Sequence, residues 1–387
     1  MLPANTSRCA ELSTSTHVLD LPNTANASHV LSAKSSRTLF PIEKCLYCHH
    51  YPAIAVTHIS AVPDSVKNVP GRLFCLVLLA AATALAASRP TPVILDTDIG
   101  DDIDDALALS LALQSPELNV LAVSTVLQHG DARRDLVARI LELYGRPEIP
   151  VGVGAERPLV APPLHVPLVQ ASAIPPGFHA PGERRNGVEL IIDTCLRSPE
   201  KVTILAYGPL TNIALALRAE SRLRDKIERI VLMNGVFFRP GLEYNTMTDP
   251  EASAIVYSSG LPVETVGLDV TMQCQLTAAQ LGRLEASTLP TVRFLMQLIH
   301  LWQGANPGHL PILHDPLAIA VTDRPGLVTL RAGRVEVETR GTPHETYGMS
   351  VFHPDPAGNV RVAEEVDSAG VVDFFLDRVL APPRSIH

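Results

Sequence analysis

The sequence predicts an α/β fold, an open and mostly parallel β-sheet flanked by helices. From about residue 93, short apolar runs rich in β-branched residues alternate with segments of helical spacing. This alternation is typical of βαβ units and a parallel sheet. Polar residues recur directly after the apolar runs, namely Asp98, His129, Tyr207, Asn234 and Asp269. Because the carboxyl ends of parallel strands meet at one sheet edge, these residues predict a ligand site there.

The predicted elements follow one another from residue 93 to the end of the chain. We expect strands at 93–95, 118–126, 149–153, 202–206, 226–233 and 262–268, and a β-rich segment at 326–352. We expect helices at 106–114, 133–144, 187–198 and 213–218, a helix that follows Ala252 and ends at Ser258, and further helices over most of 276–304 and from 314. The pair Ser115-Pro116 and Gly145 end the first two helices. Residues 155–185 are rich in Pro, Ala, His and Gly without a period, as in functional or mobile loops.

Composition excludes some classes of partner. The 387 residues carry a formal net charge of −9, and Lys and Arg are scattered, so we expect neither nucleic acid nor an anionic membrane as a partner. The predicted domain, 90–387, contains only two of the six cysteines, Cys195 and Cys274, which is too few for a disulfide framework.

The first ninety residues do not resemble the rest. Residues 1–68 have mixed polarity and no sustained period, so we expect a disordered leader, with translation beginning near Val66 or Val69. Residues 69–86 read as a signal peptide, with an apolar run from Leu73 to Leu85 and the small-x-small site Ala84-Leu85-Ala86. We therefore expect a periplasmic or secreted protein without stable membrane insertion, or a cytoplasmic one if this segment is unused. The segment Cys45-Leu-Tyr-Cys48-His49 matches a haem-attachment pattern, but we interpret it as a coincidence in the leader.

The most informative stretch is an acidic loop between the first predicted strand and its helix. Six carboxylates lie within ten residues: Asp96, Asp98, Asp101, Asp102, Asp104 and Asp105. They repel one another unless protons or a cation compensate, and hard divalent cations prefer such oxygen ligands. An EF-hand is excluded, because a loop beginning at Asp96 has Gly100 and Leu107 where acidic ligands are required. A structural interpretation, in which the acids cap the following helix, accounts for only one or two of the six. A phosphatase-type Asp-x-Asp pair, Asp96 and Asp98, would require a phosphate-binding Lys nearby, and the sequence offers no convincing one.

Five segments, taken in order, resemble the inosine–uridine-type nucleoside hydrolases. The first is Asp96-Thr-Asp-Ile-Gly-Asp-Asp-Ile-Asp-Asp-Ala, a longer form of that family's N-terminal signature. The others are Ala206-Tyr-Gly-Pro-Leu-Thr-Asn212, Val231-Leu-Met-Asn-Gly235, Glu243-Tyr-Asn245 with Asp249-Pro-Glu, and Leu313-His-Asp-Pro316. The resemblance implies a Rossmann-like core and hydrolysis of the N-glycosidic bond of ribonucleosides to ribose and free base, as in purine or pyrimidine salvage. It also implies Ca²⁺ as cofactor and a homo-oligomer, a dimer or tetramer.

The resemblance assigns roles in binding or catalysis to nine residues. Asp98, Asp105, Asp315 and the backbone carbonyl of Tyr207 would hold Ca²⁺, and Asp98 would be the base for a calcium-bound water. His314 would act as an acid on the departing base. Asp104 and Asp315 would bind ribose hydroxyls, Glu243 and Asn245 the 5′-hydroxyl, and Met233 would lie beside the sugar. Asp96 would orient its neighbours, and Asp101 and Asp102 receive no role.

Three departures from the family pattern leave an alternative open. The interval from Met233 to Glu243 is shorter than usual and lacks an expected sugar-contacting Asn, and Gln128, His129 or Asp131 would replace another Asn near the water. Residues 179–187 match the family's His-Gly motif poorly. The alternative is a non-catalytic or divergent member that binds a nucleoside or another ribosylated ligand through the calcium cleft. The preferred nucleobase is not readable from the sequence.

Overall fold

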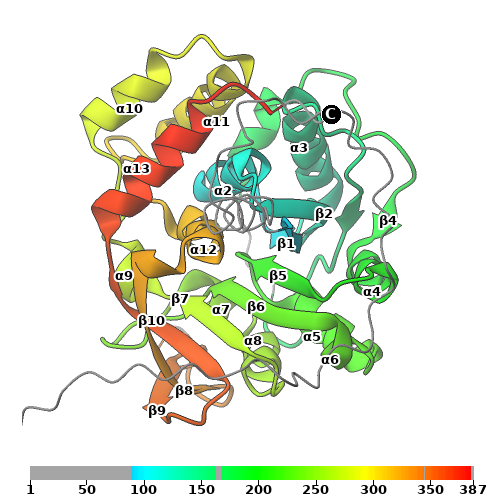
Figure 1. The fold of residues 1–387 in the computed structure, drawn as a ribbon, viewed down its shortest axis with the longest axis vertical. Coiled ribbons are helices and arrows are strands. Elements are labelled where there is room, and N and C mark those ends of the chain that lie inside the picture. Colours follow the sequence, from blue (N-terminus) through cyan, green and yellow to red (C-terminus); the bar gives the residue numbers. More distant parts are fainter. Residues whose placement is uncertain (1–88, 163–166, 344, 385–387) are drawn as a thin grey trace, which may run out of the picture. The chain divides into compact units, whose positions relative to one another are not determined.

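Ten strands among the described residues form one sheet, in the order β4-β3-β2-β1-β5-β6-β7-β10-β8-β9 (Figure 1). The strands are β1 (Thr91–Thr97), β2 (Leu118–Thr125), β3 (Val151–Val153), β4 (Arg185–Asn186), β5 (Val202–Ala206), β6 (Ile227–Met233), β7 (Val263–Val266), β8 (Val328–Val337), β9 (Ser350–Pro354) and β10 (Val360–Val366). All pairs from β4 to β10 are parallel, whereas β8 pairs antiparallel with β10 and with β9. The predicted open, mostly parallel sheet is confirmed.

The computed structural model describes residues 89–162, 167–343 and 345–384. All of them belong to one compact unit, Leu79–His387. The predicted leader, the predicted signal peptide and the Cys45-x-x-Cys48-His49 motif lie outside the described residues. Within the described ranges, no helix combines the length and apolar character needed to cross a membrane.

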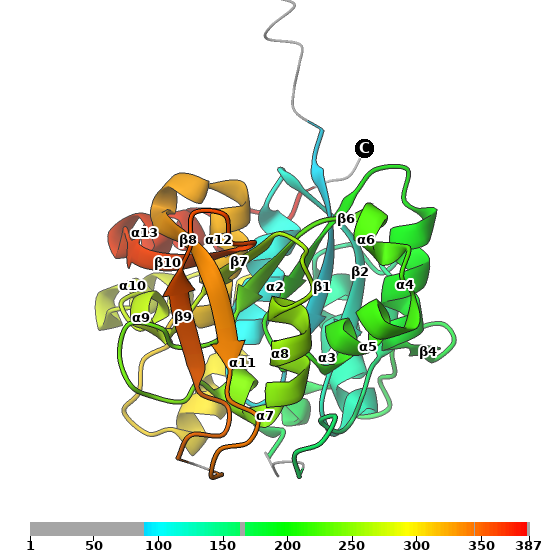
Figure 2. The same ribbon diagram turned by 90° about the horizontal axis from the view of Figure 1, so that it is seen from below.

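The helices lie on both faces of the sheet. They are α2 (Asp104–Gln114), α3 (Gly130–Leu143), α4 (Gly187–Arg197), α5 (Thr211–Ala219), α6 (Leu223–Lys226), α7 (Tyr244–Thr248), α8 (Pro250–Tyr257), α9 (Leu268–Thr271), α10 (Ala278–Glu285), α11 (Pro290–Ala305), α12 (His314–Asp323) and α13 (Ser368–Val379), with the 3₁₀ turns η2 (Val169–Ala173) and η3 (Pro325–Leu327). Figure 2, seen from below, shows α4 and α5 on the opposite side of β1 and β2 from α13. The helical stretch expected at 276–304 is interrupted, and Pro290 begins α11 as its first residue.

Alternating side chains on the buried strands supply two apolar cores. Val93 and Leu95 of β1 belong to the core that α2, α3, α11, α12 and α13 cover. Ile94 points to the opposite face and belongs to the core under α4, α5 and α8. This is the period-two alternation of a strand whose two faces are both buried. A sheet covered in this way leaves the ends of its strands as the place for a ligand.

Candidate active site

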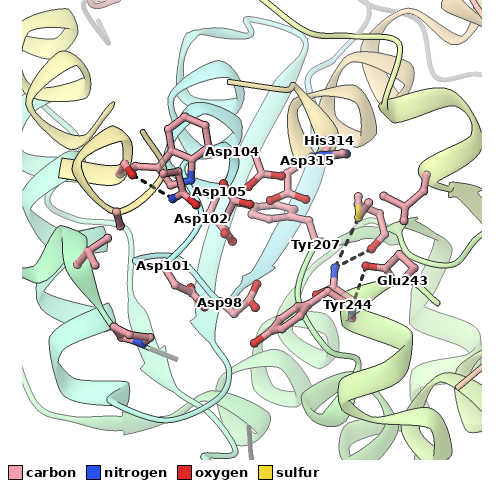
Figure 3. A pocket seen from close by; sticks show the side chains of 18 of the residues that line it. Asp98, Asp101, Asp102, Asp104, Asp105, Tyr207, Glu243, Tyr244, His314 and Asp315 are labelled. Carbon is pink, nitrogen blue, oxygen red and sulfur yellow. Dashed lines mark hydrogen bonds between the residues drawn. The ribbon is translucent and has the colours of Figure 1, made fainter. Parts of the chain in front are cut away.

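A cavity of about 560 Å³ opens beside the carboxyl ends of β1, β5 and β6 (Figure 3). All nine residues assigned a role in binding or catalysis line it: Asp98, Asp104, Asp105, Tyr207, Met233, Glu243, Asn245, His314 and Asp315. They come from segments as far apart as the acidic loop and α12. The structure therefore brings the predicted residues together in one site.

The acidic loop reaches the cavity because the chain turns sharply after β1. Gly100 has φ of +128°, a conformation that L side chains rarely adopt, and a Cβ there would meet Leu168 at 2.4 Å. The turn leads directly into α2, whose first residues are Asp104 and Asp105. The helix has no side-chain cap, so capping does not account for these two acids. The partial positive charge of the helix N-terminus favours their ionised forms.

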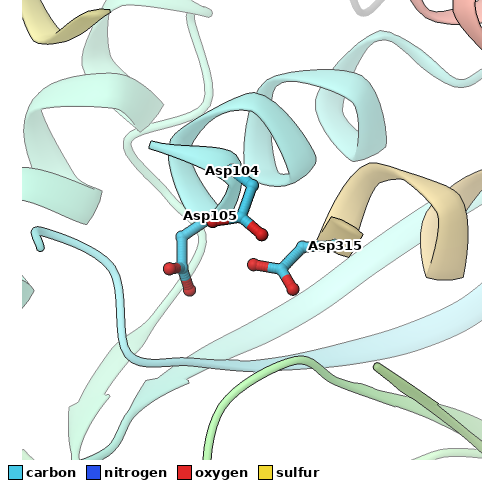
Figure 4. A group of neighbouring side chains, drawn as sticks. All are labelled: Asp104, Asp105 and Asp315. Atoms are coloured by element: carbon cyan, nitrogen blue, oxygen red, sulfur yellow. The ribbon is translucent and has the colours of Figure 1, made fainter. Parts of the chain in front are cut away.

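Three buried carboxylates form a compact cluster at the cavity wall (Figure 4). Asp104 and Asp105 from α2 and Asp315 from the first turn of α12 each place one oxygen within 4.8 Å of the other two. Burial raises the pKa of each carboxyl well above its ordinary value, and repulsion from the neighbouring carboxylates raises it further. The hydroxyl of Thr97 donates a hydrogen bond to Oδ1 of Asp105 at 2.5 Å and fixes its orientation.

The cluster suits a hard metal ion. Its ligand atoms are all carboxylate oxygens, and Asp98 and Tyr207 line the same cavity. Oxygens on opposite sides of a Ca²⁺ ion lie at most about 5 Å apart, twice the usual ligand distance, so a spread within 4.8 Å fits one ion. The positive charge would also relieve the repulsion that raises the carboxyl pKa values. The cluster contains Asp104, for which the sequence implied no metal role, and does not contain Asp98, which was expected as a ligand.

Glu243 and Asn245 border the cavity from α7. The Glu243 carboxylate caps this helix, since Oε1 accepts from the Asn245 N–H at 2.7 Å and Oε2 accepts from the Thr246 N–H at 2.9 Å. Oε2 also accepts from the Gly235 N–H at 2.9 Å, which joins α7 to the end of β6. Oε1 has one such donor and can accept another hydrogen bond from a ligand. Asn245 donates from Nδ2 to the carbonyl of Met233 at 3.1 Å.

His314 is held through one ring nitrogen. Its Nδ1 lies 2.7 Å from the Thr271 hydroxyl, and the residue lines the cavity. Burial lowers the pKa of His314 to about 4, so the imidazole is neutral at pH 7. When the Thr271 hydroxyl donates to Nδ1, the hydrogen is on Nε2, which is then available as a hydrogen-bond donor.

Several polar residues expected at the sheet edge have structural roles instead. Asn234 accepts from Thr246 and Tyr257 through Oδ1, and Asp269 accepts from the backbone N–H groups of Phe237 and Phe238. The three residues expected to replace an Asn near the water, Gln128, His129 and Asp131, are absent from the described lining of the cavity. Asp131 instead forms an exposed ion pair with Arg184 at 2.6 Å.

The structure adds lining residues to which the sequence assigns no role: Asp101, Asp102, Pro167, Val169, Leu242, Tyr244, Leu268, Trp302, Ala305 and Asn306. Trp302 and Asn306 lie at the end of α11, where helical spacing alone does not distinguish a cavity-facing residue from a core residue. Asp102 contributes a backbone carbonyl to the loop structure, because it accepts from Gln170. Asp96 is buried behind the cavity, where Asn212 and Ser124 donate to its Oδ1.

Comparison with known proteins identifies the family. The model of the family "Inosine-uridine preferring nucleoside hydrolase" matches residues 93–373. The chain belongs to this family. Over 309 residues it is 37% identical to the pyrimidine-specific ribonucleoside hydrolase RihA of Salmonella gallinarum, covering 74% of this chain and 98% of RihA.

Solved structures agree with this assignment. The plant nucleoside hydrolase PpNRh1 superposes with a TM-score of 0.66 and 28% identity, covering 76% of this chain and all of that one. A purine-preferring ribonucleoside hydrolase from Gardnerella vaginalis gives a TM-score of 0.66 and 29% identity, covering 75% of this chain and 98% of the other. This family member is therefore an enzyme that hydrolyses ribonucleosides to ribose and a free base, and its buried Asp cluster can bind a metal ion.

Proposed function

We propose that the enzyme is calcium-dependent, with Asp98, Asp105, Asp315 and the carbonyl of Tyr207 holding the ion. The carboxylate cluster of Asp104, Asp105 and Asp315 supports a Ca²⁺ site, because its donors are all oxygen and their separation suits this ion. Asp98 and Tyr207 line the same cavity. When bound, Ca²⁺ supplies positive charge that orders the ribose hydroxyls and makes a water more acidic. Asp104 lies within the same cluster and is placed to accept from the ribose hydroxyls or to complete the ligand set.

Asp98 acts as the general base. Its carboxyl is buried at the end of β1 and lines the cavity, where it can take a proton from the attacking water. N-glycosidic cleavage develops positive charge on the ribose, and the surrounding carboxylates stabilise that charge. Glu243 and Asn245 bind the 5′-hydroxyl, and Met233 lies against the sugar. His314 donates a hydrogen bond from Nε2 to the departing base.

The test of this assignment is release of reducing sugar from inosine, uridine, adenosine and cytidine, with and without a chelator. The wild-type enzyme should lose activity in chelator and regain it on addition of Ca²⁺. Asp98→Asn preserves the shape of the side chain but removes the base, and kcat should fall by about 10²- to 10⁴-fold. A variant with full activity at Asp98→Asn, or a wild-type enzyme indifferent to chelation, would refute the assignment.

Pyrimidine ribonucleosides are the preferred substrates in this proposal. RihA is described as pyrimidine-specific and shares 37% identity, whereas the purine-preferring Gardnerella enzyme shares 29%. The ratio of kcat/KM for uridine to that for inosine measures the preference. A ratio below one would overturn it.

The proposal also includes export of the enzyme and its assembly into an oligomer. A signal peptide at 69–86 would direct the enzyme to the periplasm or outside the cell, where it acts as a homo-oligomer without nucleic-acid or membrane partners. N-terminal sequencing of the native protein tests export, because a mature chain beginning well before residue 80 excludes cleavage after Ala86. Light scattering measures the mass of the assembly, and a monomeric mass excludes the oligomer.

A further inference from the structure

A fully buried arginine lies directly behind the acidic loop. The side chain of Arg133, on α3, is only 1% exposed, which for arginine requires compensating partners. Its Nη1 donates to the carbonyl of Asp98, to the carbonyl of Ile99 at 2.8 Å, and to Oδ1 of Asp101 at 3.0 Å. Arg133 is not among the residues that line the cavity. Its contacts are therefore with the loop that carries the site and not with the space a substrate would occupy.

The same guanidinium joins two loops. Its Nε donates to the carbonyl of Gln128 at 2.8 Å, in the turn that follows β2. On either side of Gln128, Leu127 and His129 have φ of 68° and 66°, values that are strained for residues other than glycine. Such a backbone persists only when its surroundings hold it. Arg133 thus fixes the exit of β1 relative to the exit of β2.

Gln170 of η2 holds the remaining part of the acidic loop. Its backbone N–H donates to the carbonyl of Gly100 at 3.1 Å, and its side-chain amide donates to the carbonyl of Asp102. Four carbonyls of the loop, from Asp98 to Asp102, therefore have donors from α3 or η2. A loop held at so many points presents its side chains in one orientation.

We propose that Arg133, held by Asp101, is a positioning residue that directs the Asp98 carboxylate into the cavity. The hydrogen bond to the Asp98 carbonyl fixes the backbone from which that carboxylate projects, and the Asp101 ion pair keeps the guanidinium in place. This assigns a role to Asp101, one of the two extra acids in the longer loop. The inference rests on the role proposed above for Asp98 and goes beyond it by naming what sets its geometry.

The experiment compares substitutions at two adjacent buried arginines. Arg134 is 9% exposed and also donates to backbone carbonyls, those of Pro181 and Gly182, but these lie outside the cavity wall. Arg133→Met and the matched control Arg134→Met each remove a buried guanidinium and keep an apolar stem. Thermal melting, kcat, KM for uridine and the Ca²⁺ concentration for half-maximal activity are measured for both.

We expect Arg133→Met to lower kcat by about 10²-fold, because misplacement of a catalytic group by about 1 Å has an effect of this size. KM should change by less than about threefold, since the substrate contacts remain. Arg134→Met should lower the melting temperature while kcat stays within about twofold of wild type. Asp101→Asn should lower kcat less than Arg133→Met, and Arg133→Lys should recover part of the loss, since Lys retains the charge but cannot reach all four acceptors.

Equal kcat values for Arg133→Met and Arg134→Met would overturn the inference, since burial alone would then account for Arg133. If Arg133→Met does not fold, Asp101→Asn and Arg133→Lys decide, and wild-type kcat in both of these variants overturns the inference. Asp98→Asn separates the two proposals. Full activity in Asp98→Asn refutes the role of Asp98, whereas an inactive Asp98→Asn beside an active Arg133→Met refutes only the positioning role.

Discussion

Replacement of Asn212 by Leu tests how the buried polar network behind the site contributes to stability. Asn212, near the start of α5, is 0% exposed and joins three segments. Its amide donates to Oδ1 of Asp96 at 2.8 Å and to the carbonyl of Thr125 at 3.0 Å, and its Oδ1 accepts from the Ala155 N–H at 2.8 Å. Leu has a similar volume and makes none of these bonds.

The magnitude follows from the partners that remain. The Thr125 carbonyl keeps the Gly154 N–H at 2.8 Å and Asp96 keeps the Ser124 hydroxyl, but the Ala155 N–H loses the Asn212 acceptor. An orphaned buried donor costs about 1–3 kcal/mol, a lost bond to a carboxylate about 1.5–3 and a lost neutral bond about 0.5–1.5, so the free energy of unfolding should fall by roughly 3–7 kcal/mol. For a domain of about 300 residues the unfolding entropy is about 0.6 kcal/mol/K, which converts this loss to about 5–11 °C in Tm.

Differential scanning calorimetry of the full chain measures the change. The control is Asn119→Leu, the same substitution at an exposed position of β2, for which we expect a change in stability within about 0.5 kcal/mol. A Tm for Asn212→Leu within 2 °C of wild type (about 1 kcal/mol) would show that the three hydrogen bonds contribute little to stability. The reasoning about this network would then be wrong.

Three further predictions concern the metal, His314 and the thiols. Removal of Ca²⁺ with a chelator should lower Tm by about 4 °C, the equivalent of about 2.7 kcal/mol at a hundredfold excess over Kd, and an unchanged Tm would contradict the metal site. His314→Ala should lower kcat on uridine by about 10²- to 10⁴-fold but leave hydrolysis of p-nitrophenyl riboside nearly unchanged, because nitrophenolate leaves as a stable anion without a hydrogen bond from Nε2; equal losses on both substrates would exclude His314 as the donor to the departing base. Burial raises the pKa of Cys195 and of Cys274 from 9.0 to about 12. At pH 8 the native thiols should therefore react with iodoacetamide about 10³-fold more slowly than the same thiols in urea, and the rate should rise as the pH approaches 12. Mass spectrometry of the two cysteine peptides measures the rate of alkylation.

The sequence alone predicted the parallel part of the sheet well, because each buried strand is a local apolar run that ends at a turn or a polar residue. The strand expected at 202–206 coincides with β5, and the one at 226–233 begins one residue before β6. Three other elements were harder to predict. The edge strand β4 has two residues, the interior strand β10 contains the exposed pair Glu364-Glu365, and α13 becomes a helix of the core only by packing against α2 and α12.

The residues of the site could likewise be predicted from local pattern only in part. All nine residues expected from sequence motifs line one cavity. Asp98, Tyr207 and Met233 could be expected together from pattern alone, because they lie at the carboxyl ends of parallel strands, which meet at one sheet edge. Their neighbours across the fold are decided by tertiary contacts. The sequence does not show that Asp104 lies with Asp105 and Asp315, which is more than two hundred residues away, or that Glu243 caps a helix as well as facing the cavity.

Asp101 illustrates the limit most clearly. By sequence it is one more acid in a loop of six. Its partner Arg133 lies 32 residues later on a different element, and only the packing of α3 against the sheet brings the guanidinium beneath the loop. Local pattern thus determined which strands form and which residues carry chemistry, because these depend on the residues themselves and their immediate neighbours. The tertiary structure alone decided how the carboxylates are held, because a buried charge is stabilised by whatever group the fold places beside it.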